Sequence, residues 1–217
     1  MILQAVVTKY IPTNAYFYID DTTKHGFLID PGAQADKLRQ ITAEKGFVIE
    51  KILLTHGHFD HIGAVTELQK AWGAEVCMHE NGKAYAENPE WNLSLQTGKG
   101  IVLENVTYLP DNTVITLKAN PEHKLQLIAV PGHTTDGCTY YSEKDGVAFV
   151  GDSVFYESYG RTDMPGGDEE TLLNNIAKRI MCLPESTILL PGHDDRTSVK
   201  HERRMPWYKL SSQTSQL

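Results

Sequence analysis

The segment from Thr55 to His61 holds the residues best suited to chemistry. It reads Thr-His-Gly-His-Phe-Asp-His, so three histidines and one aspartate fall within six positions. Imidazole nitrogens and carboxylate oxygens are good ligands for zinc, iron or manganese. Four potential ligands from one segment exceed what a single tetrahedral site needs, since other segments also contribute. The segment therefore predicts two adjacent metal ions.

Three further positions share one local pattern, a potential ligand beside glycine after an apolar run. His133 and His193 each follow a Pro-Gly pair, and Asp152 follows a Val-Gly pair. Glycine permits tight turns, and the strand ends of layered α/β sheets are where ligand sites collect. Each residue alone reads equally well as an ordinary polar residue in a turn. Together with the first segment, they predict further metal ligands.

The elements around the first segment explain how its side chains can converge. Residues 51–55 form a short apolar run that predicts a buried strand. Residues two apart in an extended strand end point the same way, so His56 and His58 can project together. Asp60 and His61 fall where a helix is expected to begin. That helix is predicted from apolar residues at three- and four-residue steps, namely Ile62, Val65, Leu68 and Trp72.

Strand-like and helix-like patterns alternate along the rest of the chain. Strands are predicted over 2–8, 16–20, 26–30, 76–79, 113–117, 125–130, 138–142, 147–151 and 188–190. Helices are predicted over 33–45 and over 169–181, the second capped by Asp168. Residues 81–100 read as a short helix and a long loop. The order indicates one α/β layered domain over residues 1–217, without a linker.

Composition excludes several classes of protein. The chain has 217 residues, 20 Lys and Arg against 28 Asp and Glu, and a formal net charge of −8. An acidic chain is a poor candidate for gripping nucleic-acid phosphates, and no stretch approaches the ~20 apolar residues that span a bilayer. The N-terminus reads as a strand and not as a signal peptide. We expect a cytoplasmic protein with no nucleic-acid or membrane partner and with free cysteines, while the oligomeric state stays open.

These motifs resemble the metallo-β-lactamase superfamily, whose signature runs H-x-H-x-D-H and continues with His, Asp and His downstream. More narrowly, the chain is similar to the glyoxalase II-like group of short bacterial hydrolases. The strings that support this resemblance extend over most of the chain: Leu28-Ile29-Asp30-Pro31-Gly32, Pro131-Gly132-His133-Thr134, Gly151-Asp152-Ser153-Val154-Phe155, Gly160-Arg161-Thr162-Asp163 and Pro191-Gly192-His193.

The resemblance implies a four-layer αββα sandwich with the metals at one edge. It implies that His56, His58 and His133 hold one metal, that Asp60, His61 and His193 hold the second, and that Asp152 bridges both. Asp30 would support a metal-bound imidazole from behind, although an aspartate before Pro-Gly is also a common turn residue.

Departures from the family pattern concern the surroundings of the ligands. Thr135-Asp136 stand where Pro-Gly is common, and Asp194-Asp195 follow His193 where Gly-Pro is usual. The tail has Met205-Pro206-Trp207-Tyr208 in place of Asn-Pro-Phe. None of these changes removes a ligand, so they bear on the substrate pocket.

The resemblance implies a binuclear hydrolase acting on a thioester of the S-2-hydroxyacyl-glutathione type. A hydroxide bridging two divalent ions would attack the carbonyl, with Asp60 and Asp152 as the catalytic carboxylates. Zinc is the expected metal, with iron or manganese as alternatives. The substrate would be a small thioester or ester. Its expected contacts are Arg161, Tyr159 and Arg203, with Tyr156, Arg204 and Lys209 as further candidates.

Three alternatives remain open. A persulfide dioxygenase of the same superfamily would use one iron, held by His56, His133 and Asp152. A lactonase or phosphodiesterase would share the whole site. A metal-stabilised module without catalysis is disfavoured, because seven candidate ligands for two metals leave room for water, whereas structural zinc sites are closed.

Overall fold

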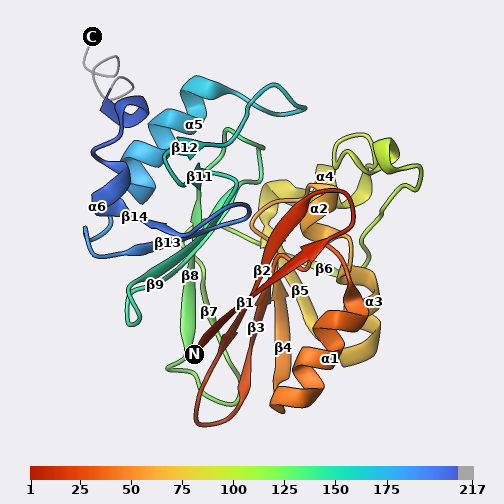
Figure 1. Ribbon diagram of the computed structural model, residues 1–217. Helices are drawn as coiled ribbons and strands as arrows, with labels where there is room; N and C mark the ends of the chain where they lie inside the picture. The colour runs from red at the N-terminus through yellow and green to blue at the C-terminus, as the bar shows by residue number, and fades with distance from the viewer. Residues whose placement is uncertain (210–217) are drawn as a thin grey trace.

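The computed structural model describes residues 1–209, in which two six-stranded sheets pack face to face (Figure 1). The first sheet follows chain order: β1 (Ile2–Thr8), β2 (Pro12–Ile19), β3 (His25–Ile29), β4 (Val48–Leu53), β5 (Glu75–His79) and β6 (Val106–Leu109). β1, β2 and β3 pair antiparallel, whereas β3 to β6 pair parallel. The parallel strands end at one edge of the sheet, where the segment after β4 emerges.

The second sheet is built from the second half of the chain. Its order is β14 (Thr197–Ser198), β13 (Ile188–Pro191), β10 (Val147–Gly151), β9 (Cys138–Ser142), β8 (Lys124–Ala129) and β7 (Val114–Thr116). Only β10 and β13 pair parallel. A separate hairpin, β11 (Val154–Phe155) with β12 (Ser158–Tyr159), follows β10.

Helices cover the outer faces of both sheets. α1 (Ala35–Lys45) and α3 (Val65–Trp72) lie on the first sheet, and α5 (Glu169–Asn175) lies on the second and continues into a π-helical turn, η3 (Ile176–Ile180) (Figure 1). Short helical segments complete the chain: α2 (Phe59–Ile62), η1 (Glu80–Gly82), α4 (Lys83–Glu87), η2 (Ser94–Thr97) and α6 (Val199–Glu202). The predicted four-layer αββα sandwich is confirmed.

Three hydrophobic cores lie between the four layers of the sandwich. Strand β2 contributes to two of them. Phe17 and Ile19 belong to the core beneath α1 and α3, whereas Tyr16 and Tyr18 belong to the core between the sheets. Alternate residues of a strand face opposite sides, so a strand with cores on both faces is apolar throughout. A third core, around Leu172, joins the second sheet to α5.

Two predicted helices differ from the structure. The helix expected from residue 62 to 72 is two helices, because the chain bends at Gly63 and Ala64 to pack on the 30–33 loop. The Ala64 amide donates to the Pro31 carbonyl at 2.9 Å, and a Cβ at Gly63 would lie 2.1 Å from the Gly32 carbonyl oxygen. The helix predicted over 169–181 changes to π geometry at Ile176. The prediction omitted β6, whose half-buried residues give no clear apolar pattern.

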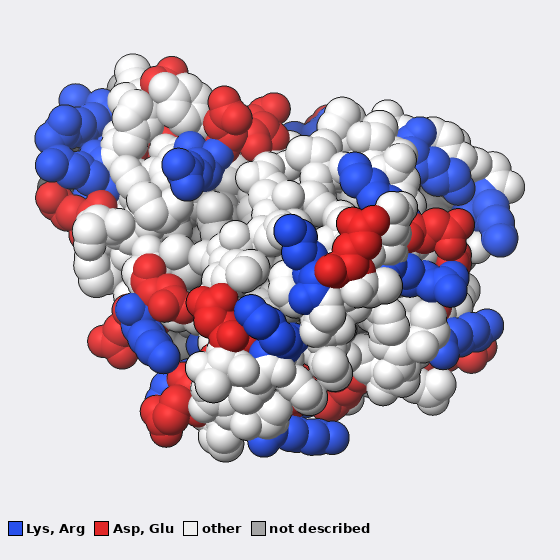
Figure 2. All heavy atoms as spheres, turned by 60° about the horizontal axis from the view of Figure 1, so that its bottom comes forward, with Lys and Arg blue, Asp and Glu red and all other residues white. Residues whose placement is uncertain are grey.

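The surface carries both signs of charge. Acidic and basic side chains are intermixed over most of the face in Figure 2. Within residues 1–209, no helix combines the length and the hydrophobicity that crossing a membrane requires.

Candidate metal centre

Four strand ends bring the candidate ligands to one edge of the sandwich. His56 and His58 follow β4, and Asp60 and His61 lie in α2. The remaining three follow β8, β10 and β13 of the other sheet and are His133, Asp152 and His193. Their side chains form two groups of possible metal ligands, His56 with His58 and His133, and Asp60 with His61 and His193. Asp152 forms a third group with His56 and His61 that links the two, and the ligand atoms of each group lie within 4.8 Å of one another.

The first group consists of three buried imidazoles. His56 Nε2 lies 3.0 Å from His58 Nδ1, which lies 3.1 Å from His133 Nε2. The three side chains belong to residues only 2%, 3% and 4% exposed. Three converging ring nitrogens with so little access to water form a set of donors that a single cation fits.

The second group lies beside the first and is richer in carboxylate. His193 Nε2 is 3.2 Å from Asp60 Oδ2 and 3.3 Å from Asp152 Oδ2. The other Asp152 oxygen, Oδ1, is 3.3 Å from His61 Nε2, and Asp152 Oδ2 is 3.7 Å from His133 Nε2. Asp152 thus faces ring nitrogens of both groups.

Three of these imidazoles direct their outward nitrogen at a fixed acceptor, whereas the outward Nε2 of His58 has no hydrogen-bond partner within residues 1–209. His133 Nδ1 donates to the Arg161 carbonyl at 2.6 Å, and His193 Nδ1 donates to the Pro12 carbonyl at 2.7 Å. His61 Nδ1 donates to Asp30 Oδ2 at 3.0 Å. A proton on each Nδ1 leaves the lone pair on Nε2, which points into the cluster, and this is how proteins orient metal-binding histidines.

Asp30 is both a turn residue and a hydrogen-bond partner of a candidate ligand, the two roles that the sequence left open. It lies in the turn after β3 with a φ of 49°, and its carboxylate reaches back beneath the cluster. Oδ1 accepts from the Thr55 amide at 2.8 Å, and Oδ2 accepts from the Thr55 hydroxyl at 2.6 Å. The Thr55 oxygen in turn lies 3.2 Å from His56 Nδ1, so it accepts the proton of that nitrogen. Asp30 therefore contacts His61 directly and His56 through Thr55.

Two glycines allow this close arrangement. Gly192 precedes His193, and a Cβ there would lie 2.4 Å from Asp152 Oδ1 and 2.5 Å from His61 Cε1. Gly151 has a φ of 51°, and a Cβ there would lie 2.3 Å from the Thr55 hydroxyl oxygen. Any side chain at either position would displace a group of the cluster.

Burial and neighbouring charges set the protonation of the cluster. Burial lowers the pKa of His56 well below its usual range and lowers the pKa of His58 to about 3. Burial also opposes charge on His61 and His193, but the surrounding carboxylates, Asp152 and Asp60 foremost, together outweigh it, so the pKa of His61 rises well above its usual range and that of His193 rises to about 10. His61 and His193 together outweigh the effect of burial on Asp152 and lower its pKa well below its usual range. His56 and His58 are therefore neutral, whereas His61 and His193 hold protons that a cation would replace.

The predicted substrate contacts lie outside this cluster and are engaged within the protein. The Arg161 guanidinium binds both oxygens of Asp163 at 2.6 Å, and the Tyr159 hydroxyl donates to Glu169 at 2.7 Å. Arg203 donates to the Met181 carbonyl and pairs with Glu185. Tyr156 stacks on His201 at the surface. The structure therefore does not bring these groups to the candidate ligands as free binding groups.

Sequence reasoning omitted Thr55 as a functional residue, although it opens the histidine segment. It also treated Asp136 only as a departure from the family pattern. Asp136 is 1% exposed, and neither carboxylate oxygen has a hydrogen-bond partner of acceptable geometry within residues 1–209. Burial raises the pKa of Asp136 to about 7. The position of Asp136, shortly after the segment that carries His133, was the sequence feature that could have pointed to it.

Known proteins resemble this chain along most of its length. Residues 9–193 match the family model of the metallo-beta-lactamase superfamily. The probable metallo-hydrolase YqgX of Bacillus subtilis is 38% identical, over 89% of this chain and 90% of the relative. Hydroxyacylglutathione hydrolase GloC of Haemophilus influenzae is 33% identical, over 90% of this chain and 94% of the relative.

Solved structures agree with these relatives. The crystal structure of BLEG-1 B3 metallo-beta-lactamase superposes with a TM-score of 0.88 and 34% identity, covering 96% of this chain and 99% of that one. The di-iron-bound form of TTHA1623 superposes with a TM-score of 0.80 and 30% identity, covering 94% and 99%. With its sandwich fold and its edge cluster of histidines and aspartates, the chain belongs to the metallo-β-lactamase superfamily and to its glyoxalase II-like group.

Proposed function

We propose that this protein is a binuclear metal-dependent hydrolase that cleaves a thioester of the S-2-hydroxyacyl-glutathione type. The observation that carries the proposal is the pair of ligand groups with Asp152 between them. Similarity to hydroxyacylglutathione hydrolase GloC along 90% of the chain supports the substrate class. Because the ligand atoms come from strand ends of both sheets, the fold itself holds the two groups side by side.

The residues present fit two cations. His61 Nε2 and Asp152 Oδ1 are buried and lie 3.3 Å apart, yet neither has a hydrogen-bond partner of acceptable geometry within residues 1–209. Buried polar atoms without partners are costly, and a cation between them would remove the cost. His56, His58 and His133 would hold one metal, and Asp60, His61 and His193 the other, with Asp152 shared. This nitrogen and oxygen set suits zinc, and it also accepts iron or manganese.

The proposed chemistry is attack of water on the thioester carbonyl. Bound divalent metals supply hydroxide at neutral pH, by lowering the pKa of water from 15.7 toward ~7, and a positive charge for the developing oxyanion. Asp60, whose side chain is 10% exposed, would accept a hydrogen bond from the attacking water and orient it. The new C–O bond forms first, and the electron pair of the carbonyl π bond moves to the oxygen; when that pair re-forms the carbonyl, the C–S bond breaks, and the departing thiolate takes a proton from the water.

Metal content and two assays on one sample test the function. Protein purified without chelator or added metal is expected to hold close to two metals per chain and to hydrolyse the thioester without consuming oxygen. About one iron per chain with oxygen uptake on a glutathione persulfide would overturn the proposal in favour of a dioxygenase. Two metals with neither activity would reject the thioester and direct the search to lactones and phosphodiesters.

Asp152→Ala tests the shared carboxylate. We expect the variant to lose metal and hydrolysis together, because Asp152 faces both ligand groups. Unchanged turnover with a full metal content would refute the binuclear mechanism.

A further inference from the structure

A groove of about 940 Å³ begins beside the candidate metal centre. Asp60 belongs both to the second ligand group and to the lining of this groove. The groove is bounded by the β1–β2 turn, the 32–37 segment, α3 and the 97–102 loop. Its volume is that of a pocket for a drug-sized ligand, far more than an acyl group alone would fill.

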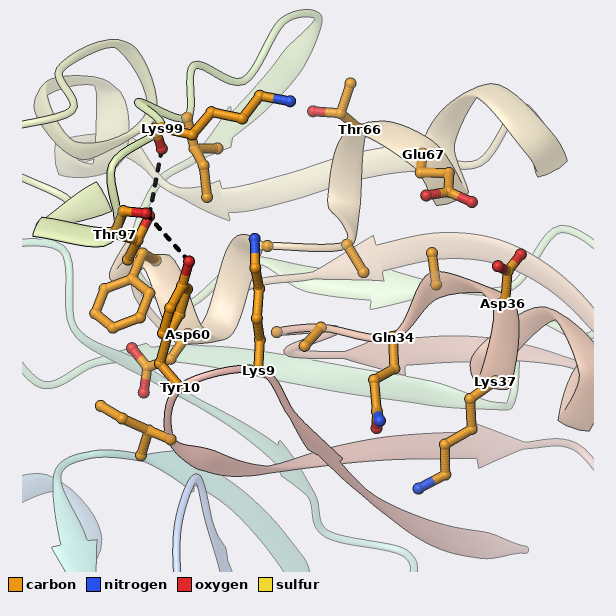
Figure 3. Close-up of a pocket in the computed structure, with 18 of the residues that line it drawn as sticks. Lys9, Tyr10, Gln34, Asp36, Lys37, Asp60, Thr66, Glu67, Thr97 and Lys99 are labelled. Atoms are coloured by element: carbon orange, nitrogen blue, oxygen red, sulfur yellow. Dashed lines mark hydrogen bonds between the residues drawn. The ribbon is translucent and has the colours of Figure 1, made fainter. Parts of the chain in front are cut away.

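The groove presents lysines whose charges are not paired within the protein. Lys9, Lys70 and Lys99 line it, and none of them forms an ion pair within residues 1–209. Figure 3 shows Lys9 and Lys99 extending into the groove from opposite sides. In that view they lie between the end marked by Asp60 and the end marked by Glu67. Unpaired cations along a cavity attract an anionic ligand.

The acidic groups of the groove do not cancel these lysines. Asp36 and Glu67 lie at the end away from Asp60 in Figure 3, and both approach the same Arg39 guanidinium nitrogen, at 3.4 Å and 3.6 Å. Two of the predicted cationic contacts elsewhere are engaged within the protein, since Arg161 pairs with Asp163 and Arg203 pairs with Glu185. The lysines of the groove therefore keep their positive charge available to a ligand.

The walls near Asp60 are apolar. The Tyr10 hydroxyl donates to the Thr97 carbonyl at 3.1 Å, and its ring packs edge-on against Phe59 with centroids 6.1 Å apart. Lys9 Nζ lies 5.2 Å from the centroid of the Tyr10 ring. Tyr10 and Val102 both line the groove and are 53% and 50% exposed. Apolar walls beside cations fit an amphipathic chain that ends in an anion.

We propose that this groove binds the thiol arm of the substrate, with Lys9 and Lys99 holding a carboxylate or phosphate remote from the scissile bond. The inference rests on the proposed thioester hydrolysis and names the part of the substrate that the chain recognises. A peptide thiol would supply carboxylates, and a nucleotide-bearing thiol would supply phosphates. Lys70 lines the same groove and adds to the attraction.

Equilibrium binding of thioethers tests the groove without catalysis. The probes are S-methylglutathione, S-methyl-coenzyme A and the neutral S-methyl-N-acetylcysteamine, titrated calorimetrically into the purified holoenzyme. Their blocked sulfur keeps a free thiol away from the metals. We expect one of the two anionic probes to bind, and its identity distinguishes carboxylate from phosphate. K9E/K99E should weaken that binding by about tenfold or more, since each exposed pair contributes up to about fivefold.

Matched variants separate this inference from the proposed function. K124E/K144E makes the same charge change at exposed lysines of β8 and of the β9–β10 turn, and should leave binding unchanged. K9R/K99R keeps both positive charges and should therefore bind the anionic probe as wild type does. Binding without thioester hydrolysis would reject the function and keep the groove. Hydrolysis with the same KM in wild type and K9E/K99E, or the absence of any lysine-dependent binding, would overturn the groove proposal.

Discussion

Hydrogen bonds behind the cluster decide how its imidazoles point. The chain from His56 through the Thr55 hydroxyl to Asp30, together with the direct bond from His61, anchors two candidate ligands on one carboxylate. Such outer partners fix the tautomer and the ring orientation, and they raise the basicity of the ligand nitrogen. The metal affinity of the centre therefore depends on Thr55, which contacts no metal in the proposed arrangement.

Thr55→Val tests this dependence, because it removes the hydroxyl and keeps the β-branched shape. We expect the metal dissociation constant to rise by about tenfold, the lower end of the range for outer partners. Competition with a chromophoric chelator measures it. Thr139→Val is the matched control, since the buried Thr139 hydroxyl has no hydrogen-bond partner within residues 1–209. Equal metal affinity in the Thr55 variant and its control would contradict the expectation.

Asp136 gives the folded protein a specific dependence on pH. Burial raises its pKa from 3.8 to about 7, so the folded state retains a proton that the unfolded chain releases near pH 4. The contribution of this carboxyl group to the free energy of unfolding is fully present below pH 4. It falls as the pH rises from about 4 to about 7, and above pH 7 it does not change further.

Asp136→Asn removes that dependence, since an amide does not ionise. The melting temperature of the metal-free variant should exceed that of metal-free wild type by more at pH 8 than at pH 5. Asp195→Asn, at an exposed position, should show no such trend. A difference between Asp136→Asn and wild type that is the same at both pH values would show that burial does not raise this pKa.

The candidate ligands were accessible to sequence reasoning because their signal is local. Closely spaced histidines after an apolar run, and glycines beside His133, Asp152 and His193, are visible without a structure. Thr55, the groove around Lys9 and Lys99, and the engagement of Arg161 with Asp163 depend on contacts that spacing does not reveal. A cation that follows a motif cannot be read as a substrate contact until its partners are known.

Helix α5 begins at the N-cap that the sequence predicted, and its first turn packs against the turn that carries His133. The Asp168 side chain accepts from the Thr171 amide at 2.7 Å and caps the helix, as the sequence indicated. Leu172 of α5 is fully buried, and Gly132 lies so close that a Cβ there would be 2.3 Å from the Leu172 Cα. The start of α5 therefore packs against the turn that carries His133.

Asp168→Ala should destabilise the protein by about 1 kcal/mol, the usual effect of losing an N-cap. Asp168→Asn should cost much less, because asparagine caps equally well. Urea unfolding of the three proteins measures the difference. If the alanine and asparagine variants were equally stable, the cap would contribute nothing and α5 would be held by packing alone.

Helices and strands were predictable where a regular spacing of apolar residues packs against a single hydrophobic core. α1 follows its pattern and ends at Gly46, which has a φ of 66°. The helix after the ligand segment divides because Gly63 and Ala64 meet the 30–33 loop, a contact made by a different part of the chain. β14 and the β11–β12 hairpin have two residues per strand, too few for any periodicity. Tertiary contacts decide such elements, so a single sequence does not show them.

At the scale of the whole molecule, the proposed metal centre joins two halves of one sandwich. Residues 56–61 come from the first sheet and α2, whereas His133, Asp152 and His193 come from the second sheet. Along the chain, His133, Asp152 and His193 lie 72, 91 and 132 positions after His61. Metals that need ligands from both halves bind the folded state alone and stabilise it by mass action.

Removing the metals should therefore lower the melting temperature reversibly. A ligand at a thousand times its dissociation constant contributes about 4 kcal/mol per site. In a protein of this length, each 1 kcal/mol shifts the melting temperature by about 2–4 °C. Two such sites contribute about 8 kcal/mol, so we expect a decrease of about 16 to 32 °C after chelation and dialysis, recovered on adding zinc. Asp152→Ala, which lacks the shared carboxylate, should show a much smaller response. A protein that demonstrably loses its metal yet melts at the same temperature would show that the metals do not join the two halves, and that the sandwich is held by its three cores alone.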